Sequence, residues 1–193
     1  LNKVLLSIGY DITQMNQVRR AISHIKGGRL ANFINGRETL ALLISDVPGD
    51  DPAVIGSGPL TPVEEDIRQF DLPESITSIL EGVTFTPSPK QELYSNITTH
   101  VIATLDDAKV AAGKCAKKLE FNVTVYDEFM EGDAEQKAVQ LCKALSTANA
   151  GIHIWGGETS LILPPNPGRG GRNQHLAAVA ARELSGVDNI VFL

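Results

Sequence analysis

From residue 99 onward, the sequence alternates between apolar runs of strand length and amphipathic runs of helix length. Strand-length runs fall at residues 99–104, 122–126, 151–155, 160–163 and 189–193, and helical patterns fall at 106–119, 133–146 and 172–184. Regular alternation of this kind is typical of right-handed β-α-β units with a mainly parallel sheet. It therefore restricts the second half of the chain to an α/β fold.

The first half contains one continuous apolar run, TLALLI at residues 39–44, which predicts a parallel strand buried on both faces. Helical patterns are found at residues 3–8, 12–22, 29–33, 63–70 and 73–80. Residues 82–99 include Pro87-Ser88-Pro89 and show little periodicity, which favours a linker. We therefore expect two α/β lobes with mainly parallel sheets, 1–85 and 86–193, divided near residues 83–98.

The charge balance excludes some classes of function. The chain has 17 Lys and Arg against 23 Asp and Glu, a net charge of −6, whereas a general nucleic-acid or membrane-surface binder needs a basic face. Two cysteines and four histidines show neither a disulfide framework nor zinc-ligand spacing. A reducing cytoplasm is the expected location. A local basic pocket for a small anion remains compatible with this composition.

The segment GRGGRNQ at residues 168–174 has the features of an anion site. It precedes a predicted helix start, where free N–H groups and the helix dipole attract negative charge. Glycines, among them Gly170 and Gly171, let the backbone approach a ligand, and Arg169 and Arg172 supply forked, permanently charged donors. The alternative is an ordinary glycine-rich loop with solvated arginines.

Acidic side chains follow two of the predicted strands. Asp46, Asp50 and Asp51 come directly after the run at 39–44, and Glu158 follows the strand at 151–155. Ligands of open α/β sheets bind beyond the carboxyl ends of the strands, and carboxylates suit Mg²⁺. Ordinary turn chemistry explains the same residues equally well, because Asp, Gly and Pro all favour turns.

Two further glycine-rich segments lie in the first half. Lys26 and Arg29 flank Gly27-Gly28, which suits either an anion site or a helix–helix turn with solvated charges. Ser57 and Gly58 belong to IGSGP at residues 55–59, where a hydroxyl and N–H groups could reach a phosphate. The strand–turn–helix context of a serine nucleophile is missing there.

Five of these segments, in this order, resemble the glycerate 2-kinases of the MOFRL type, some of which have been labelled hydroxypyruvate reductases. The segments are NQVRR with SHIKGGRLA (16–20, 23–31), SDVPGD (45–50), VIGSGP (54–59), GGET (156–159) and GRGGRNQ (168–174). The resemblance implies that 1–85 is the C-terminal part of a Rossmann-like kinase domain. Residues 86–193 would be the N-terminal part of a smaller MOFRL-like domain.

The resemblance also implies an activity, namely ATP-dependent phosphorylation of D-glycerate to 2-phosphoglycerate, with Mg²⁺, in an interdomain cleft. It assigns catalysis to Arg172, Arg169 and Asp46, and metal binding to Asp46, Asp50 and Glu158. Substrate or phosphate binding falls to Lys26, Arg29, Ser57, Gly58, Gly170, Gly171 and Asn173. Glycerate is the expected partner, and a homodimer is one option for the oligomeric state.

The sequence also departs from the family pattern. TLD at 104–106 stands where a Gly-Asp-Asn loop is usual, and Leu60 replaces a usual threonine. The family's upstream and downstream portions are missing, so we expect a central piece of a longer protein with little activity of its own. Two alternatives stay open: a nicotinamide-dependent hydroxypyruvate reductase, although no G-x-G-x-x-G unit is visible, and a non-catalytic anion-binding domain.

Overall fold

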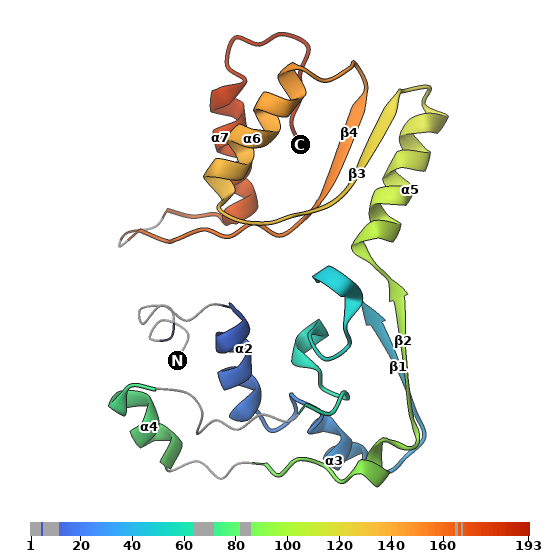
Figure 1. Ribbon diagram of the computed structural model, residues 1–193, viewed down its shortest axis with the longest axis vertical. Coiled ribbons are helices and arrows are strands. Elements are labelled where there is room, and N and C mark those ends of the chain that lie inside the picture. The colour runs from blue at the N-terminus through green and yellow to red at the C-terminus, as the bar shows by residue number, and fades with distance from the viewer. Residues whose placement is uncertain (1–4, 6–11, 64–71, 82–85, 165, 167) are drawn as a thin grey trace. The chain divides into compact units, whose positions relative to one another are not determined.

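The computed structural model describes the 193-residue chain except for residues 1–4, 6–11, 64–71, 82–85, 165 and 167. The chain divides into two compact units, Leu1–Thr104 and Leu105–Leu193, which we describe separately (Figure 1). The helices expected at 3–8 and 63–70 fall, apart from single positions, outside the described residues. No helix within the described ranges has both the length and the apolar character needed to cross a bilayer.

The first unit is built on two parallel strands, β1 (Thr39–Ile44) and β2 (Ile97–Ala103), which pair from Thr39 opposite Ile97. Its helices and 3₁₀ turns are α2 (Ile12–Ala21), α3 (Leu30–Ile34), η1 (Pro48–Asp50), η2 (Ile55–Ser57), α4 (Glu74–Glu81) and η4 (Gln91–Tyr94). Met15 and Val18 of α2 and Ile76 of α4 pack together in a small apolar cluster.

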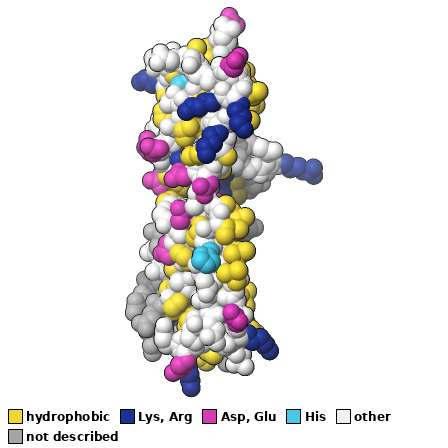
Figure 2. Space-filling model, turned by 90° about the vertical axis from the view of Figure 1, so that its right-hand side faces the viewer, with side chains coloured by type: hydrophobic (Ala, Val, Ile, Leu, Met, Phe, Trp, Pro, Cys, Tyr) yellow, Lys and Arg dark blue, Asp and Glu magenta, His cyan; other side chains and the backbone are white. Residues whose placement is uncertain are grey.

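One face of β1 and β2 is only partly covered by the described residues. Leu40, Leu42 and Ile44 of β1 are 55–70 % exposed, and Ile102 of β2 is 57 % exposed. Figure 2 shows hydrophobic side chains gathered over this face. The expectation of a strand buried on both faces is therefore wrong for these residues, because nothing that the structure describes packs on that side. The opposite face borders an apolar cavity of about 200 Å³.

β2 belongs to the first unit, because its hydrogen-bonded partner is β1. The sequence placed this strand after the domain boundary, in 86–193. The segment before β2, expected to be a linker, is instead bonded to residues 24–36. The Asn32 amide donates to Pro87 O at 3.1 Å, and the Asn96 amide donates to Gly36 O at 2.8 Å. The first unit therefore extends through Thr104.

The second unit contains the parallel strands β3 (Val123–Met130) and β4 (Ile152–Gly157). Helix α5 (Leu105–Lys118) packs on one side of them, and α6 (Ala134–Ser146) and α7 (Arg172–Glu183) lie on the other (Figure 1). Gly113 allows α5 to approach the sheet, since a Cβ there would be 3.1 Å from the Val125 side chain.

Helices α6 and α7 share the apolar core of the second unit. Their buried side chains are Ala134, Ala138, Cys142, Leu176, Val179 and Ala180. Helix α6 begins at a capping aspartate, Asp133, whose Oδ1 accepts from the N–H groups of Glu135 and Gln136, both at 3.0 Å. This pattern satisfies two of the unpaired N–H groups of the first turn.

The expected α/β class with parallel strands is confirmed. Predicted strands at 160–163 and 189–193 are not formed, however. Ser160 makes an isolated bridge with Asp133, and no strand covers 189–193. Ile162 and Val191 are 90 % and 80 % exposed, because the described residues offer no neighbouring strand against which they could pair. Apolar β-branched content alone does not make a strand without a partner.

Candidate functional site

In the first unit, two glycine-rich segments that the sequence singled out lie against each other. The carbonyl oxygens of residues 56–59 each accept a hydrogen bond from the segment 26–30. The four bonds are Lys26 Nζ to Gly56 O at 2.9 Å, Gly27 N to Ser57 O at 3.0 Å, Gly28 N to Gly58 O at 2.7 Å and Leu30 N to Pro59 O at 3.2 Å. The two segments therefore form one rigid unit.

The backbone of residues 56–58 is left-handed throughout, with φ values of +59°, +65° and +59°. Glycine tolerates this conformation, but Ser57 has a side chain and is 7 % exposed. Gly58 is sterically required, since a Cβ would lie 2.7 Å from Ala53 O. A non-glycine residue held in this region costs on the order of 1 kcal/mol or more and is often found at functional sites.

These contacts change what the Gly27-Gly28 pair can do. Both amides are already donating to carbonyls of the other segment, so neither is available to an anion. Lys26 differs, because an ammonium has three protons and its hydrogen bond to Gly56 O uses one of them. Lys26 is therefore a cation that is held in place and still able to bind a ligand.

Arg29 is placed differently from the expected substrate contact. It is only 6 % exposed, and its guanidinium donates to three backbone carbonyls. Nε bonds Thr86 O at 2.9 Å, and Nη1 bonds Arg20 O at 2.9 Å and Lys26 O at 3.1 Å. Buried in this way, Arg29 links Thr86 to the backbone of Arg20 and Lys26. It therefore stabilises the segment that carries Lys26.

Tyr94 is a residue that sequence reasoning missed. Its hydroxyl donates to Gly28 O at 3.2 Å, and any side chain at position 28 would collide with that hydroxyl. Burial raises the pKa of Tyr94, and the nearby Arg29 charge acts in the opposite direction. A tyrosine in a proline-rich stretch gave no signal, because its role depends on a contact 66 positions away.

The aspartates after β1 lie where the sheet ends. Ser45 N still donates to Ala103 O, and Asp46 follows with an exposed side chain. Asp50 is half-buried at φ +52°, and Asp51 is exposed, with Oδ1 accepting from Ala53 N of its own loop at 2.8 Å. Of these three aspartates, Asp46 and Asp50 are therefore the better candidates for contact with a ligand.

No group of three or more potential metal-binding side chains occurs in the described parts of the chain. The expected metal set draws on both units, with Asp46 and Asp50 from the first and Glu158 from the second, and it stays a prediction. Mg²⁺ in nucleotide-dependent enzymes usually takes one or two carboxylates together with phosphates and water. Asp46 and Asp50 remain compatible with that mode.

In the second unit, the segments 156–159 and 168–174 meet. The Glu158 carboxylate and the Arg172 guanidinium form an ion pair, and both side chains are about half exposed. An exposed pair contributes little to stability, so its value here is to fix the position of the arginine. Glu158 thus pairs with Arg172 in this structure, and the metal-binding role expected for it stays a prediction.

Arg172 is also the first residue of α7. Gly171 is the N-cap and provides no side-chain acceptor, and the first intrahelical bond is from His175 N to Gly171 O. The N–H groups of residues 172–174 therefore have no partner within the helix, as at any helix start. Arg169, Gly170 and Asn173 are all exposed beside them. An uncapped helix start with two arginines is suited to a phosphate or carboxylate.

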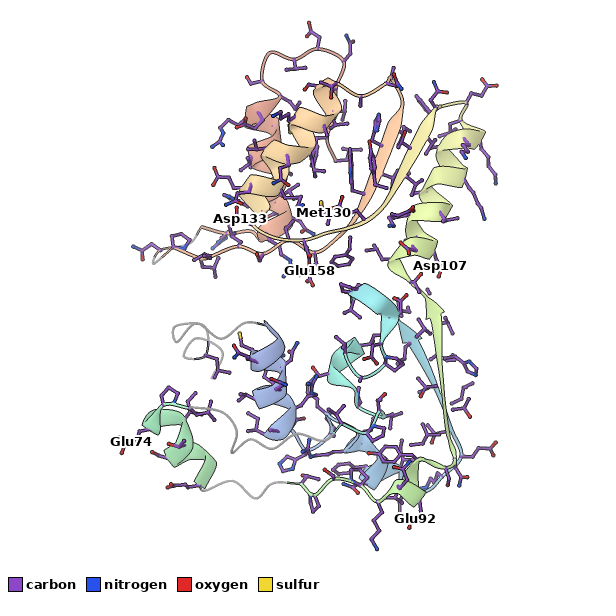
Figure 3. All side chains as sticks on the ribbon, in the orientation of Figure 1. Glu74, Glu92, Asp107, Met130, Asp133 and Glu158 are labelled. Carbon is purple, nitrogen blue, oxygen red and sulfur yellow. The ribbon has the colours of Figure 1, made fainter. Side chains whose placement is uncertain are left out.

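The glycines of the 156–159 segment have a packing role. A Cβ at Gly156 would lie 3.0 Å from side chains of Leu105 and Lys109, and one at Gly157 would collide with Met130 O. Thr159 follows, 2 % exposed, with no hydrogen-bond partner for its hydroxyl among the described residues. Figure 3 shows Met130 and Glu158 near each other at the ends of β3 and β4.

The comparisons with known proteins agree with the motif pattern. A family model described as a domain of unknown function, DUF4147, matches residues 1–93. The "D-glycerate 2-kinase" of Thermotoga maritima is 30 % identical, over 99 % of this chain and 48 % of the relative. A "Putative hydroxypyruvate reductase" of Agrobacterium vitis is 32 % identical, over 98 % of this chain and 53 % of the relative.

A solved structure is similar as well. The crystal structure of glycerate kinase from Thermotoga maritima superposes with a TM-score of 0.66 at 28 % identity, covering 96 % of this chain and 47 % of that one. The chain thus spans about half the length of the curated relatives it matches. The resemblance to glycerate 2-kinases is confirmed in both sequence and fold.

Proposed function

We propose that the protein containing this chain is a glycerate 2-kinase, which transfers the γ-phosphoryl group of ATP to D-glycerate. The observation that carries the proposal is the Glu158–Arg172 pair at the uncapped start of α7. It puts an oriented guanidinium beside free helix N–H groups. The similarity to glycerate 2-kinases over nearly the whole chain then selects the reaction among those that an anion site could serve.

The second unit would hold the anionic groups. Arg172 and Arg169 supply forked donors that match phosphate oxygens or the glycerate carboxylate, and Asn173 adds an amide. Phosphoryl transfer depends on positioning and on neutralising negative charge, rather than on covalent help from the protein. Arg172 is the stronger candidate for the catalytic arginine, because Glu158 fixes its orientation whereas Arg169 lies on an exposed loop.

The first unit carries a further cation and carboxylates that suit the same reaction. Lys26, held on Gly56 O, can bind a phosphate or carboxylate with its remaining protons. Asp46 would orient the attacking hydroxyl of glycerate, and Ser57 and Gly58 shape the rigid segment that carries Lys26. Arg29 acts through this segment and does not itself touch the substrate, since it is buried and three of its five N–H donors are used by backbone carbonyls.

Asp46 and Asp50 are the residues that would hold Mg²⁺. Both follow the end of β1, and two carboxylates are sufficient for a metal that is also bound by nucleotide phosphates. Bound there, the ion would neutralise charge on the phosphates. Glu158 is left out of this set because its carboxylate is paired with Arg172.

The test is an activity assay on the whole protein. ADP release is measured with Mg-ATP and D-glycerate, and the product is offered to enolase, which accepts 2-phosphoglycerate directly. We expect ADP release that depends on glycerate and a product that enolase consumes without a mutase. Oxidation of NADH by hydroxypyruvate without ATP would contradict the proposal and favour the activity named for the Agrobacterium vitis relative. Tight glycerate binding without turnover would favour a non-catalytic anion binder.

A further inference from the structure

Lys109 of α5 is a buried cation that the proposed function does not use. The residue is only 4 % exposed. Its Nζ lies 2.6 Å from Asp106 Oδ1 and donates to Tyr126 O at 2.9 Å and to Asp127 O at 3.4 Å. An ammonium has three protons, and three acceptors surround this one. A charge is costly to bury unless it is paired and hydrogen-bonded, so this arrangement needs a structural reason.

The two carbonyls belong to the irregular part of β3. The pairing of β3 with β4 shifts register between Val125 and Phe129, so residues 126–128 do not pair with β4. Bulges of this kind leave backbone groups without ladder partners, and they are common next to active sites. Lys109 supplies the missing donors for Tyr126 and Asp127 and so stabilises the bulge.

The stem of Lys109 also fixes the end of β4. Its Cδ lies 3.0 Å from where a Cβ of Gly156 would be, so the helix and the strand end are in close contact. The next residue, Gly157, is packed equally closely against Met130 O. Beyond Glu158, Ser160 N donates to Gly132 O at 2.7 Å. Glu158 is therefore held between two restrained points, and Lys109 contacts the first of them together with Leu105.

We infer that Lys109 is a positioning residue: it fixes the ends of β3 and β4 so that Glu158 meets and orients Arg172. The inference rests on the proposed function, in which Arg172 binds the anion. Lys109 does not touch substrate in this account. It acts through the backbone of Gly156 and through the Glu158 carboxylate.

The test is a double-mutant cycle in the whole protein. Lys109→Met keeps the apolar stem and removes the ammonium, and Glu158→Gln removes the charge that orients Arg172. We expect Lys109→Met to lower kcat about tenfold in the wild-type background and hardly at all beside Glu158→Gln, a coupling within the range for interacting residues. The control is Lys114→Met, which replaces an exposed lysine on the same helix and should leave kcat unchanged.

Stability is measured on the same four proteins. Lys109→Met should lower the free energy of unfolding equally in both backgrounds, because a purely structural loss does not depend on Glu158. An equal fall in kcat in both backgrounds, or no fall at all, would overturn the inference. If Lys109→Met does not fold, Lys109→Arg replaces it in the cycle. Lys109→Arg retains the charge with a different donor geometry. Its effect on kcat should likewise be large in the wild-type background and small beside Glu158→Gln.

A second readout separates this inference from the proposed function. Hydrogen exchange is followed at the amides of residues 156–160 and, as reference, at 176–180 in α7. We expect Lys109→Met to speed exchange at 156–160 and to leave 176–180 unchanged. The exchange rates do not depend on kinase activity. An inactive wild type would therefore refute the proposed function and leave the inference about Lys109 to be decided by hydrogen exchange. Unchanged exchange at 156–160 would overturn the inference even in an active enzyme.

Discussion

The Glu158 carboxylate lies against the Arg172 guanidinium, and this pair joins the loop after β4 to the first residue of α7. The two residues are 14 positions apart, in motifs that the sequence could only place on separate loops. Under the proposed function, their contact orients the arginine of an anion site. The pair is half exposed, so its contribution to stability is small and its positioning role is the more important one.

Replacing Arg172 by Ala should impair catalysis far more than folding. The variant loses a charge-assisted donor that would act on the phosphoryl group in the transition state, and loss of such a group typically lowers kcat by about 10²–10³-fold. Steady-state kinetics with Mg-ATP and D-glycerate measure this. Arg182→Ala is the matched control, since Arg182 lies on the same helix and pairs with Glu183 and Glu135. Equal rates for the two variants would remove Arg172 from the mechanism.

Arg29 and Lys26 should respond in opposite ways to substitution. Arg29→Met removes three buried or partly buried hydrogen bonds from a charged donor to backbone carbonyls, so we expect the free energy of unfolding to fall by about 2–4 kcal/mol. Lys26→Met should change stability by less than about 1 kcal/mol, since one bond of an exposed ammonium is lost, but it should raise the KM for an anionic substrate. Urea unfolding measures the free energy of unfolding of both variants, and steady-state kinetics measure their KM. A stable, low-affinity Arg29→Met would reverse the two roles.

Thr159→Val should stabilise the protein. The Thr159 hydroxyl is buried, and within the described residues it has no partner, so replacing it by a methyl group of the same shape removes an unsatisfied polar atom. We expect the free energy of unfolding to rise by about 1 kcal/mol. Thr159→Ser keeps the hydroxyl and should not be stabilised. A loss of stability in the valine variant would show that the hydroxyl has a partner, such as a buried water.

Stability should decrease at high pH through Tyr94. Burial raises the pKa of Tyr94 above its ordinary value of 10.0, so the folded state holds the phenol proton more tightly than the unfolded state does. The contribution is complete below pH 10 and is lost as the pH rises through the folded-state pKa. Denaturant unfolding between about pH 9 and 11.5 should show this loss, with the phenol titrating near 10 when unfolded. In Tyr94→Phe, the free energy of unfolding should lose the part of its pH dependence that is due to Tyr94. An identical pH profile in this variant and the wild type would contradict the prediction.

Much of the local structure was predictable because it depends on local patterns. The apolar run TLALLI forms β1 over the predicted residues, and the helix expected at 133–146 is α6, one residue shorter. These segments combine a clear period with a clear start signal, such as the Asp133 cap. Strands expected at 160–163 and 189–193 failed for the opposite reason, since a strand needs a neighbour that its own residues do not specify.

The site was predictable in its motifs but not in the division of roles within them. Lys26 and Arg29 are both basic residues beside the glycine pair, and the sequence does not distinguish them. Arg29 is buried and bonded to the distant carbonyl of Thr86, a contact that the sequence does not reveal. Gly27-Gly28 suited either an anion site or a turn, and the structure shows that both N–H groups donate to the carbonyls of Ser57 and Gly58. Lys109 gave no sequence signal, because two of its three partners are backbone carbonyls of an irregular strand. Long-range backbone acceptors have no side-chain signature.

The central claim is that this protein transfers phosphate to one particular hydroxyl of glycerate. The most direct measurement is ³¹P NMR of the whole protein with Mg-ATP and D-glycerate. The account predicts a growing resonance of 2-phosphoglycerate matched by conversion of ATP to ADP, and its near-absence with Arg172→Ala. A spectrum in which ATP stays intact, or in which the phosphate appears on the 3-hydroxyl, would contradict it.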